Sequence, residues 1–290
     1  MAPLLRGLRL ATLAVFAVFF VAPMLWLVLA PTKSNRDLVD RGPFTFGSFH
    51  QVATAWQHLN GFSDHIYLTW IGNSLLYAVS ATAIVVVTAV PAGYALALGD
   101  FPGRRVVLTI TLVVMIMPAA ALVLPIFLEL NALHLIGSTL SVILPFAFFP
   151  FGVNLAYIYY STAVPRELLD AARVDGCGEW ATFRHIALPL AKPVVALVLF
   201  FSFVSDWNNF FLPYTVLGDS KQYPIQVGLS LLLSSTPSFN PATGGAGQQV
   251  GIFRPELALA TLIAVIPVAI VFMLSQRTLV RGLVGGGVKE

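Results

Sequence analysis

The chain has 290 residues, of which 58% are hydrophobic and 10% are charged. Soluble domains carry about 25% charged residues, so this chain, with a mean hydropathy of +0.85, has too few polar side chains to cover a water-soluble globule. Its formal charge of +3 does not indicate nucleic-acid binding, because the basic residues are scattered at the ends of apolar segments rather than clustered with aromatic residues. The composition predicts a membrane protein that works in a lipid bilayer.

Six apolar runs are long enough to cross a bilayer, whose hydrocarbon core of about 30 Å needs about 20 apolar residues of helix. The first run follows Arg6 and Arg9, but it is longer than the apolar part of a signal peptide, so we interpret it as a retained helix. Prolines inside the runs, such as Pro118 and Pro125, favour kinks. We expect one all-α polytopic domain over residues 1–290, with six transmembrane helices at 10–30, 70–98, 106–128, 138–160, 194–217 and 256–276.

The distribution of Lys and Arg residues predicts which connections face the cytoplasm, because positively charged loops are retained on that side. With the N-terminus inside, 11 Lys and Arg residues lie on the cytoplasmic side and 5 lie outside. Both the N- and C-termini are therefore predicted to be cytoplasmic. The connection at 165–193, between the fourth and fifth helices, then faces the cytoplasm, whereas the longer connections at 31–69 and 218–255 face outward.

The connection at 165–193 is unusually polar for this chain. Pro165 suits the first turn of a helix, and Glu167 and Asp170 place negative charge near the positive end of that helix. A short helix is predicted from Pro165 to Val174. It should end at Gly176, because glycine readily adopts the left-handed conformation that closes a helix.

A second short helix is predicted after this turn. Its apolar stripe is formed, at spacings of three and four, by Trp180, Phe183 and Ala187. Leu188-Pro189 is expected to end the helix. An amphipathic connector lying in the membrane interface is one interpretation of this segment. The small side chains of Ala171 and Ala172 beside the glycine turn favour close docking against another protein instead.

Halfway along the fifth apolar run lies the short sequence SDWNN, at residues 205–209, of which all but the tryptophan are polar or charged. An ionisable group near the middle of a bilayer is costly enough to suggest function. Amide and carboxylate groups can bind hydroxyls, and an indole can stack on a sugar ring. The candidates for a substrate path are Asp206, Trp207, Asn208 and Asn209. Hydrogen bonding to a second subunit is the alternative interpretation.

The sequence contains no catalytic or metal-binding pattern. The five histidines are not spaced with acidic residues, or with the single cysteine Cys177, as metal ligands would be. No nucleophile elbow occurs, and the phosphate-binding pattern G-x-x-x-x-G-K-[ST] is absent, so ATP would have to be bound by another chain. We expect no catalytic residue, metal or cofactor in this chain.

Within 165–193 a series of residues stands in a distinctive order. They are Asp170, Ala171, Ala172, Asp175, Gly176, Trp180, Phe183, Ile186, Leu188, Pro189 and Pro193. This order closely resembles the EAA loop of ABC importer permeases, E-A-A-x-x-D-G-A-x-x-W-x-x-F-x-x-I-x-L-P-x-x-x-P, with Asp in place of the first Glu and Cys177 in place of the Ala after the glycine. Asn73-Ser74, the FPGR sequence at 101–104 and YPIQVGL at 223–229 are similar to the maltose-type, carbohydrate-uptake branch.

The resemblance implies a permease subunit that moves a sugar or sugar-like solute into the cytoplasm, by alternating access, across a bacterial-type cytoplasmic membrane. The implied partners are two cytoplasmic ABC ATPase subunits that bind ATP and Mg, a second homologous permease and an extracytoplasmic sugar-binding protein. The ATPase-coupling residues that it implies are Asp170, Ala171, Ala172, Asp175, Gly176, Trp180, Phe183 and Pro189. Trp180 and Phe183 are expected to anchor the second helix to its own chain.

The stretch from Ser234 to Gly251 is uncharged and rich in turn-forming residues, which by itself indicates a flexible loop. A loop at this place in maltose-type permeases contacts the binding protein, so the resemblance implies such contacts over 222–249. The residues implied are Gln222, Tyr223, Phe239, Asn240 and Gln248.

Two other kinds of transporter remain alternatives, a permease for another polar solute and a secondary transporter. A secondary transporter would be expected to carry charge pairs in several spans rather than Asp206 alone. The chain also shows no internal repeat of the kind from which many such carriers are built. An intramembrane enzyme would need facing Asp, His or Ser/His groups at membrane depth, which the sequence does not provide.

Overall fold

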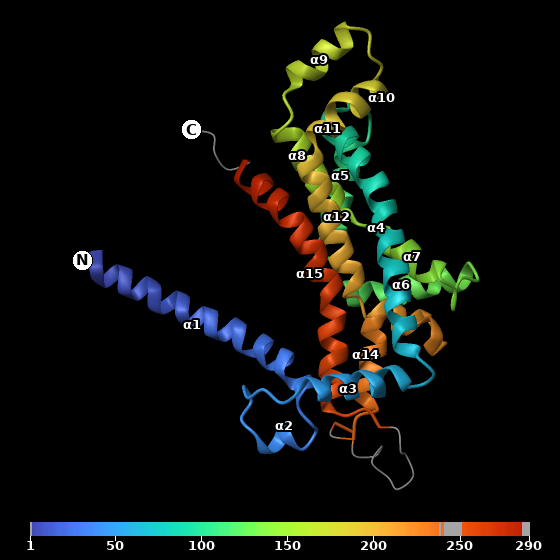
Figure 1. Ribbon diagram of the computed structural model, residues 1–290. Coiled ribbons are helices and arrows are strands. Elements are labelled where there is room, and N and C mark those ends of the chain that lie inside the picture. The colour runs from blue at the N-terminus through green and yellow to red at the C-terminus, as the bar shows by residue number, and fades with distance from the viewer. Residues whose placement is uncertain (1, 238, 241–250, 286–290) are drawn as a thin grey trace. The chain divides into compact units, whose positions relative to one another are not determined.

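The computed structural model describes residues 2–237, 239–240 and 251–285, and every regular element within these ranges is helical (Figure 1). In chain order the α-helices are α1 (Ala2–Leu29), α2 (Asp37–Asp40), α3 (Phe49–Gly61), α4 (Ile66–Leu98), α5 (Arg104–Ile116), α6 (Ala119–Ala132), α7 (Leu140–Phe146), α8 (Pro150–Thr162), α9 (Arg166–Val174), α10 (Glu179–Thr182), α11 (Leu188–Leu190), α12 (Lys192–Trp207), α13 (Phe211–Val216), α14 (Ile225–Ser234) and α15 (Arg254–Gly285). Two short 3-10 helices, η1 (Ala30–Thr32) and η3 (Ser220–Gln222), and the π-helix η2 (Phe183–Ala187) lie between them. The predicted all-α fold is confirmed for the described residues.

Several of these helices are long and apolar enough to span a membrane. Four segments pass this test singly, and they are Leu5–Thr32, Ile66–Leu98, Leu140–Thr162 and Arg254–Gln276. Two more pass it only as pairs of helices joined at a bend, α5 with α6 at 110° and Glu179–Leu190 with α12 at 78°. The described residues therefore hold four to six spans, and the straight helix expected over 106–128 is divided in two.

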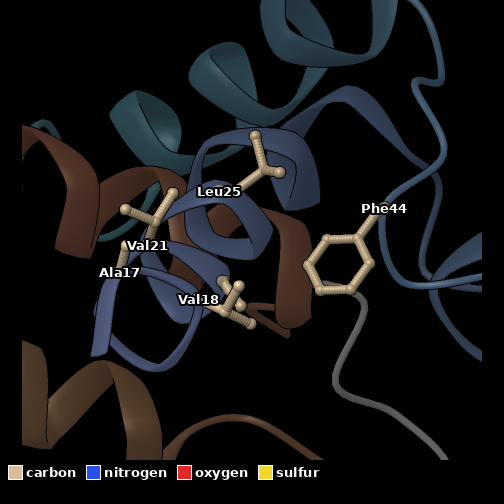
Figure 2. Close-up of a pocket in the computed structure, with 6 residues that line it drawn as sticks. Ala17, Val18, Val21, Leu25 and Phe44 are labelled. Atoms are coloured by element: carbon tan, nitrogen blue, oxygen red, sulfur yellow. The ribbon is translucent and has the colours of Figure 1, made fainter. Parts of the chain in front are cut away.

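The described helices fall into two compact units. The first unit contains Met1–Trp70 and Gly228–Ile266, and the second contains Ile71–Val227 and Pro267–Glu290. In the first unit, α1 leaves its apolar side chains largely uncovered, as suits a helix that faces lipid or another helix. An apolar pocket of about 370 Å³ lies between α1 residues such as Val18 and Leu25 and the ring of Phe44, which faces α1 (Figure 2).

Buried polar groups hold the segment after α1 in the first unit. Lys33 is 1% exposed, and its ammonium group donates to the carbonyl oxygens of Gly42 at 2.8 Å and Pro43 at 3.0 Å. The Gly47 amide donates to the Thr32 hydroxyl at 3.0 Å, and a Cβ at Gly47 would collide with the Thr32 carbonyl. The backbone at position 47 passes so close to the Thr32 carbonyl that only glycine fits there.

Side chains also tie α3 and the start of α4 to α15 within the first unit. His58 Nδ1 lies 3.1 Å from Glu256 Oε1, and the other carboxylate oxygen of Glu256 accepts from the Phe253 amide at 3.2 Å. The Tyr67 hydroxyl donates to the Ala260 carbonyl at 2.8 Å. Glu256 thus caps the N-terminal end of α15 and holds α3 beside it.

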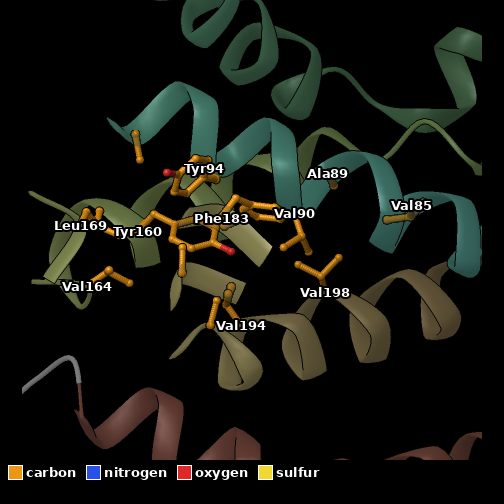
Figure 3. Packing of buried hydrophobic residues seen from close by; sticks show 14 residues of the cluster. Val85, Ala89, Val90, Tyr94, Tyr160, Val164, Leu169, Phe183, Val194 and Val198 are labelled. Atoms are coloured by element: carbon orange, nitrogen blue, oxygen red, sulfur yellow. The ribbon is translucent and has the colours of Figure 1, made fainter. Parts of the chain in front are cut away.

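The main core of the second unit lies among α4, α8 and α12 (Figure 3). It is formed by Val85, Ala89, Val90, Tyr94, Ala97, Ala156, Tyr160, Val164, Leu169, Phe183, Ala187, Ala191, Val194 and Val198. A Cβ at Gly93 would collide with the side chain of Ala156, so glycine allows α4 and α8 to approach closely. This core reaches residues of α9 and η2, which means that the polar 165–193 segment is packed onto the helical body by its own apolar side chains.

Three apolar segments of the second unit are each interrupted between two helices. The breaks fall at 117–118 between α5 and α6, at 147–149 between α7 and α8, and at 208–210 between α12 and α13. Pro118 is the last residue of the first break and Pro150 directly follows the second, and at both places the missing N–H group costs no helical hydrogen bond. The helix expected over 194–217 is therefore not continuous, and the third break falls on its polar residues.

Candidate functional site

The first part of the candidate site is the helical loop at 166–190, which begins with α9 and a turn at Gly176. The Cys177 amide donates to the Ala172 carbonyl at 2.9 Å, the six-to-one bond that closes many helices. Gly176 has a φ of +85°, in the left-handed region that side chains with a Cβ rarely enter. The glycine turn predicted from the sequence is confirmed, and it joins α9 to α10.

One guanidinium bridges the two sides of this turn. Arg173 Nη1 donates to Asp170 Oδ1 at 3.0 Å within α9, and Arg173 Nε donates to Glu179 Oε1 at 3.0 Å at the start of α10. Its hydrogen bond to Glu179 raises the pKa of the Arg173 guanidinium above its usual value. Glu179 also accepts from the Tyr94 hydroxyl of α4 at 3.4 Å.

Aromatic packing fixes the second half of the loop on the helical body (Figure 3). Phe183 is 5% exposed, and its ring centroid lies 5.0 Å from that of Tyr94, which in turn packs edge-on against Tyr160 at 5.4 Å. Leu169 of α9 is buried in the same cluster. The predicted role of Phe183 as an anchor to its own chain agrees with this burial.

Two expectations about the second half of the loop differ from the structure. Trp180, predicted to share the anchoring stripe, touches the Phe183 ring at a centroid distance of 5.4 Å but remains 66% exposed. The helix does not end at Leu188-Pro189, which lies in α11; the bend comes at Ala191, just before Pro193. Proline at 193 cannot donate to the carbonyl of the residue four positions earlier, and this missing bond accounts for the later break.

The predicted coupling residues do not share one surface. Asp170, Ala171, Asp175, Gly176 and Pro189 are exposed on the described loop, as is Trp180, whereas Ala172 and Phe183 are buried against the body. Sequence reasoning missed Val174, whose apolar side chain is 88% exposed at the end of α9. Val174 is an apolar residue at the end of the predicted helix, and it does not share the buried face of Leu169. This position was the signal that could have identified it.

The second part of the candidate site is a cavity of about 530 Å³ in the second unit. It is lined by residues of α5, α6, α7, α8, α12 and α13, next to the three helix breaks. Its polar lining consists of Ser205, Asp206, Asn208 and Asn209, and its aromatic lining includes Phe148, Phe149, Phe151, Phe210 and Phe211. The structure thus brings together three of the four predicted substrate-path residues and adds phenyl rings that the sequence did not single out.

Hydrogen bonds orient the polar wall of this cavity. Asp206 is 8% exposed and accepts from the Ser202 hydroxyl at 3.4 Å. Asn208 donates to the Val204 carbonyl at 2.8 Å, which leaves its amide oxygen toward Gln226 at 3.5 Å. Trp207, the fourth predicted residue, does not line the cavity. It is 2% exposed and stacks on Phe203 at 5.6 Å.

The residues expected to contact a binding protein are divided between the two units. In the second unit, the carbonyls of Gln222 and Tyr223 accept from Tyr77 at 2.9 Å and Asn73 at 3.1 Å, so this short segment is fixed to α4. In the first unit, Phe239 is exposed beyond α14 and the Asn240 side chain donates to the Ser234 carbonyl at 3.1 Å. Gln248 lies outside the described residues, as do all residues from 241 to 250.

Comparison of the sequence with known proteins identifies a family and several similar permease proteins. Residues 89–285 match the family described as binding-protein-dependent transport system inner membrane component. The chain is 31% identical over 281 residues to the arabinooligosaccharides transport system permease protein AraQ of Bacillus subtilis (strain 168), covering 94% of this chain and 92% of that protein. It is 28% identical over 271 residues to the diacetylchitobiose uptake system permease protein NgcG of Streptomyces coelicolor, covering 92% and 83%.

A solved structure has the same fold. It is a crystal structure of a bacterial ABC transporter involved in the import of the acidic polysaccharide alginate, and the matched chain superimposes with a TM-score of 0.78. The match covers 95% of this chain and 96% of that chain at 23% sequence identity. At this level of identity the likeness establishes the architecture of the helices and nothing about what they carry.

Proposed function

The chain belongs to the family of binding-protein-dependent transport system inner membrane components, and from this we propose that it is the permease subunit of an ATP-driven importer that carries a sugar into the cytoplasm. It is a multi-pass protein of the inner membrane. Full-length similarity to AraQ proteins, at 31% and 32% identity, supports an oligosaccharide as the solute. A lactose permease protein and a maltodextrin permease protein among its relatives point to the same class.

The cavity between the broken helices is the observation that carries the proposal. Sugars present hydroxyls around their edge and apolar C–H groups on their faces, so a suitable site combines hydrogen-bonding groups with aromatic rings. Asp206, Asn208 and Asn209 supply acceptors and donors on one wall, and rings such as Phe149 and Phe211 supply flat apolar surfaces. Its volume of about 530 Å³ lies within the range of small-molecule sites.

We propose that the loop at 166–190 contacts the ATPase subunits. In the assembly that we propose, two ATPase subunits bind ATP and Mg in the cytoplasm, and this chain pairs with a second homologous permease. The N- and C-termini lie in the cytoplasm with the loop. ATP binding can drive the membrane helices only if the loop binds more tightly to one state of the ATPases than to the other. Its charged bridge and buried Phe183 support transmission of that difference to α4, α8 and α12.

We also assign an extracytoplasmic sugar-binding protein as the donor of the solute. The segment with Gln222 and Tyr223 and the residues Phe239 and Asn240 are the contacts that we propose, each in its own unit. An exposed phenyl ring at Phe239 supports such a contact, because aromatic side chains are enriched where proteins bind one another. Gln248 belongs to the same proposal.

Reconstitution tests the function directly. The chain is assembled in liposomes with its ATPase, its companion permease and its binding protein, and ATP hydrolysis is measured with arabino-oligosaccharides, lactose, maltodextrins and non-sugar polar solutes. Stimulation by one sugar class with its uptake into the liposomes is expected. Stimulation by a non-sugar solute alone, or uptake that continues without ATP, would contradict the proposal.

A pair of variants connects the cavity to the solute. Asn208→Ala removes an amide that faces the cavity, and it is expected to raise the KM for uptake roughly tenfold, because a buried hydroxyl of the sugar loses its partner. Thr88→Ala is the control, since its hydroxyl donates to the Ile84 and Val85 carbonyls of its own helix and the residue does not line the cavity. An unchanged KM in Asn208→Ala would show that Asn208 serves subunit contact instead.

A further inference from the structure

A separate cavity, of about 510 Å³, lies in the second unit at the turn between α4 and α5. Residues of the turn, of the first two turns of α5 and of α8 line it; those that carry its chemistry are Asp100, Arg104, Arg105, Val106, Leu108 and Tyr157. None of these residues lines the cavity proposed for the sugar. We propose that this second cavity binds a membrane phospholipid through a zwitterionic phosphoethanolamine headgroup.

The frame of the cavity is fixed by Arg104. Its guanidinium donates to three carbonyl oxygens at the end of α4, those of Leu96 at 2.6 Å, Ala97 at 3.0 Å and Gly99 at 3.2 Å. These bonds satisfy carbonyls that the end of a helix would otherwise leave without partners. Gly103, with a φ of +88°, then starts α5 directly beyond the turn. The turn is therefore held in one conformation, and all three nitrogens of the Arg104 guanidinium take part in holding it.

Arg105 is free to serve a different purpose. Its exposed guanidinium makes no hydrogen bond or ion pair with any residue in the described part of the chain. The same holds within the described ranges for the Asp100 carboxylate and the Tyr157 hydroxyl, which line the same cavity. The cavity therefore presents one cation, one anion and one hydroxyl that the chain itself does not pair.

This set of groups complements a phosphoethanolamine headgroup. A guanidinium binds a phosphate with two parallel hydrogen bonds, and the Tyr157 hydroxyl can donate a third. The Asp100 carboxylate suits the ammonium end of the same headgroup, and it would repel a second anion. A purely anionic headgroup would leave Asp100 unpaired, which is why the charges favour the zwitterionic lipid.

The location of the cavity favours a lipid over a soluble phosphate compound. The charged turn ends at Arg105, and the eleven residues from Val106 to Ile116 contain no ionisable group. Val106 is 60% exposed on α5, so an acyl chain could lie along this helix while its headgroup occupies the cavity. This step rests on the proposed function, which places the turn at the cytoplasmic membrane surface, where basic pockets between helices bind headgroups.

The test uses the assembled transporter in detergent, with lipid binding followed by native mass spectrometry. Phosphatidylethanolamine is titrated against phosphatidylglycerol of the same acyl chains, and soluble phosphoethanolamine and inorganic phosphate are added as competitors. Phosphatidylethanolamine is expected to bind most tightly. The Arg105→Gln variant should weaken its binding roughly tenfold, because a charge-assisted bidentate contact is lost, and Asp100→Asn should remove the preference over phosphatidylglycerol.

Matched variants keep the result open to refutation. Arg166→Gln removes another exposed arginine of the same cytoplasmic side and should leave lipid binding unchanged. Tyr157→Phe provides a second probe if Arg105→Gln does not assemble. Equal binding of both lipids, unchanged binding in Arg105→Gln, or competition by the soluble phosphates as strong as that by the lipid would overturn the proposal. Sugar-stimulated ATP hydrolysis is measured on the same preparations, so a failure of the transport function is distinguished from a failure of the lipid site.

Discussion

Arg173 and Glu179 form an ion pair at 3.0 Å across the Gly176 turn, which links the two halves of the loop at 166–190. Both side chains are largely exposed, so the pair contributes little to the free energy of unfolding, on the order of 0.2–1 kcal/mol. Its significance is geometric. Because the Tyr94 hydroxyl also donates to Glu179, the pair connects α9 to α4 through the start of α10.

The first prediction concerns this pair. Arg173→Gln should leave expression and assembly near the wild-type level, because a surface pair adds little stability. It should lower the number of sugar molecules imported per ATP hydrolysed, because α9 can then tilt without moving α4. The ratio is measured in proteoliposomes, with Arg184→Gln as the control, since Arg184 is exposed on the same loop without a described partner. An unchanged ratio in Arg173→Gln would remove the pair from the coupling path.

The second prediction concerns the turn itself. No atom lies within 4 Å of a Cβ built at Gly176, so space is not what excludes other residues there. The left-handed φ excludes them, and Gly176→Val is expected to cost at least about 1–2 kcal/mol or to change the path of the turn. Uptake should fall while insertion into the membrane is retained. Gly178→Val is the matched control, because Gly178 has an ordinary φ of −70° and equally open surroundings. Equal uptake in the two variants would show that the left-handed turn at Gly176 is not needed for transport.

A third prediction separates the two aromatic residues of the loop. Phe183→Ala removes a ring from the core and is expected to destabilise the protein by about 3–5 kcal/mol. Trp180→Ala should cost less than about 1.5 kcal/mol, since only its ring contact with Phe183 is lost. Its exposed ring should matter instead for the ATPase. The two variants are compared by thermal denaturation and by co-purification of the ATPase subunits. For Trp180→Ala, weakened co-purification is expected at an almost unchanged melting temperature. Full co-purification would contradict the assignment of the Trp180 ring to the ATPase contact.

The fourth prediction tests the packing of α4 on α8. Gly93→Ala places a methyl group against Ala156 and the backbone of Tyr157, and it should lower stability by about 1–3 kcal/mol. Gly72→Ala lies on the same helix with no atom within 4 Å of its Cβ, and it should raise stability by up to about 1 kcal/mol through helix propensity. The midpoint of thermal unfolding in detergent measures both. A Gly93→Ala protein as stable as Gly72→Ala would mean that the two helices are not in close contact.

Local features of the sequence were sufficient to predict some of this structure. The turn at Gly176 depends only on glycine after a short helix, and it was predicted correctly. The apolar stripe of the second helix was only partly right, because it assumed 3.6 residues per turn throughout. The π-helix at Phe183–Ala187 holds about one residue more in its turn. This shift rotates the residues after Phe183 relative to the face of Trp180, so Ala187 is buried while Trp180 is not.

The cavity could be predicted only in part, for a different reason. Asp206, Asn208 and Asn209 stand out because they are polar within an apolar run. Trp207 lies between them in sequence, but successive helical residues point about 100° apart, so it was placed wrongly. Rings such as Phe149 and Phe211 carry no local signal, since they are ordinary apolar residues until the breaks of several helices meet.

Helix α4 has one further property that follows from its hydrogen bonds. Near its first residues in the second unit, Asn73 donates to the carbonyls of Lys221 and Tyr223, and Ser74 accepts from the Ile225 amide at 2.6 Å. Near its other end, roughly 30 Å along the helix axis, Tyr94 donates to Glu179. One continuous helix is therefore hydrogen-bonded both to the outer segment and to the loop that we assign to the ATPase contact. If a binding protein docks on the outer segment as we propose, α4 itself would carry the displacement of that segment to the loop, because the same helix is hydrogen-bonded near both of its ends.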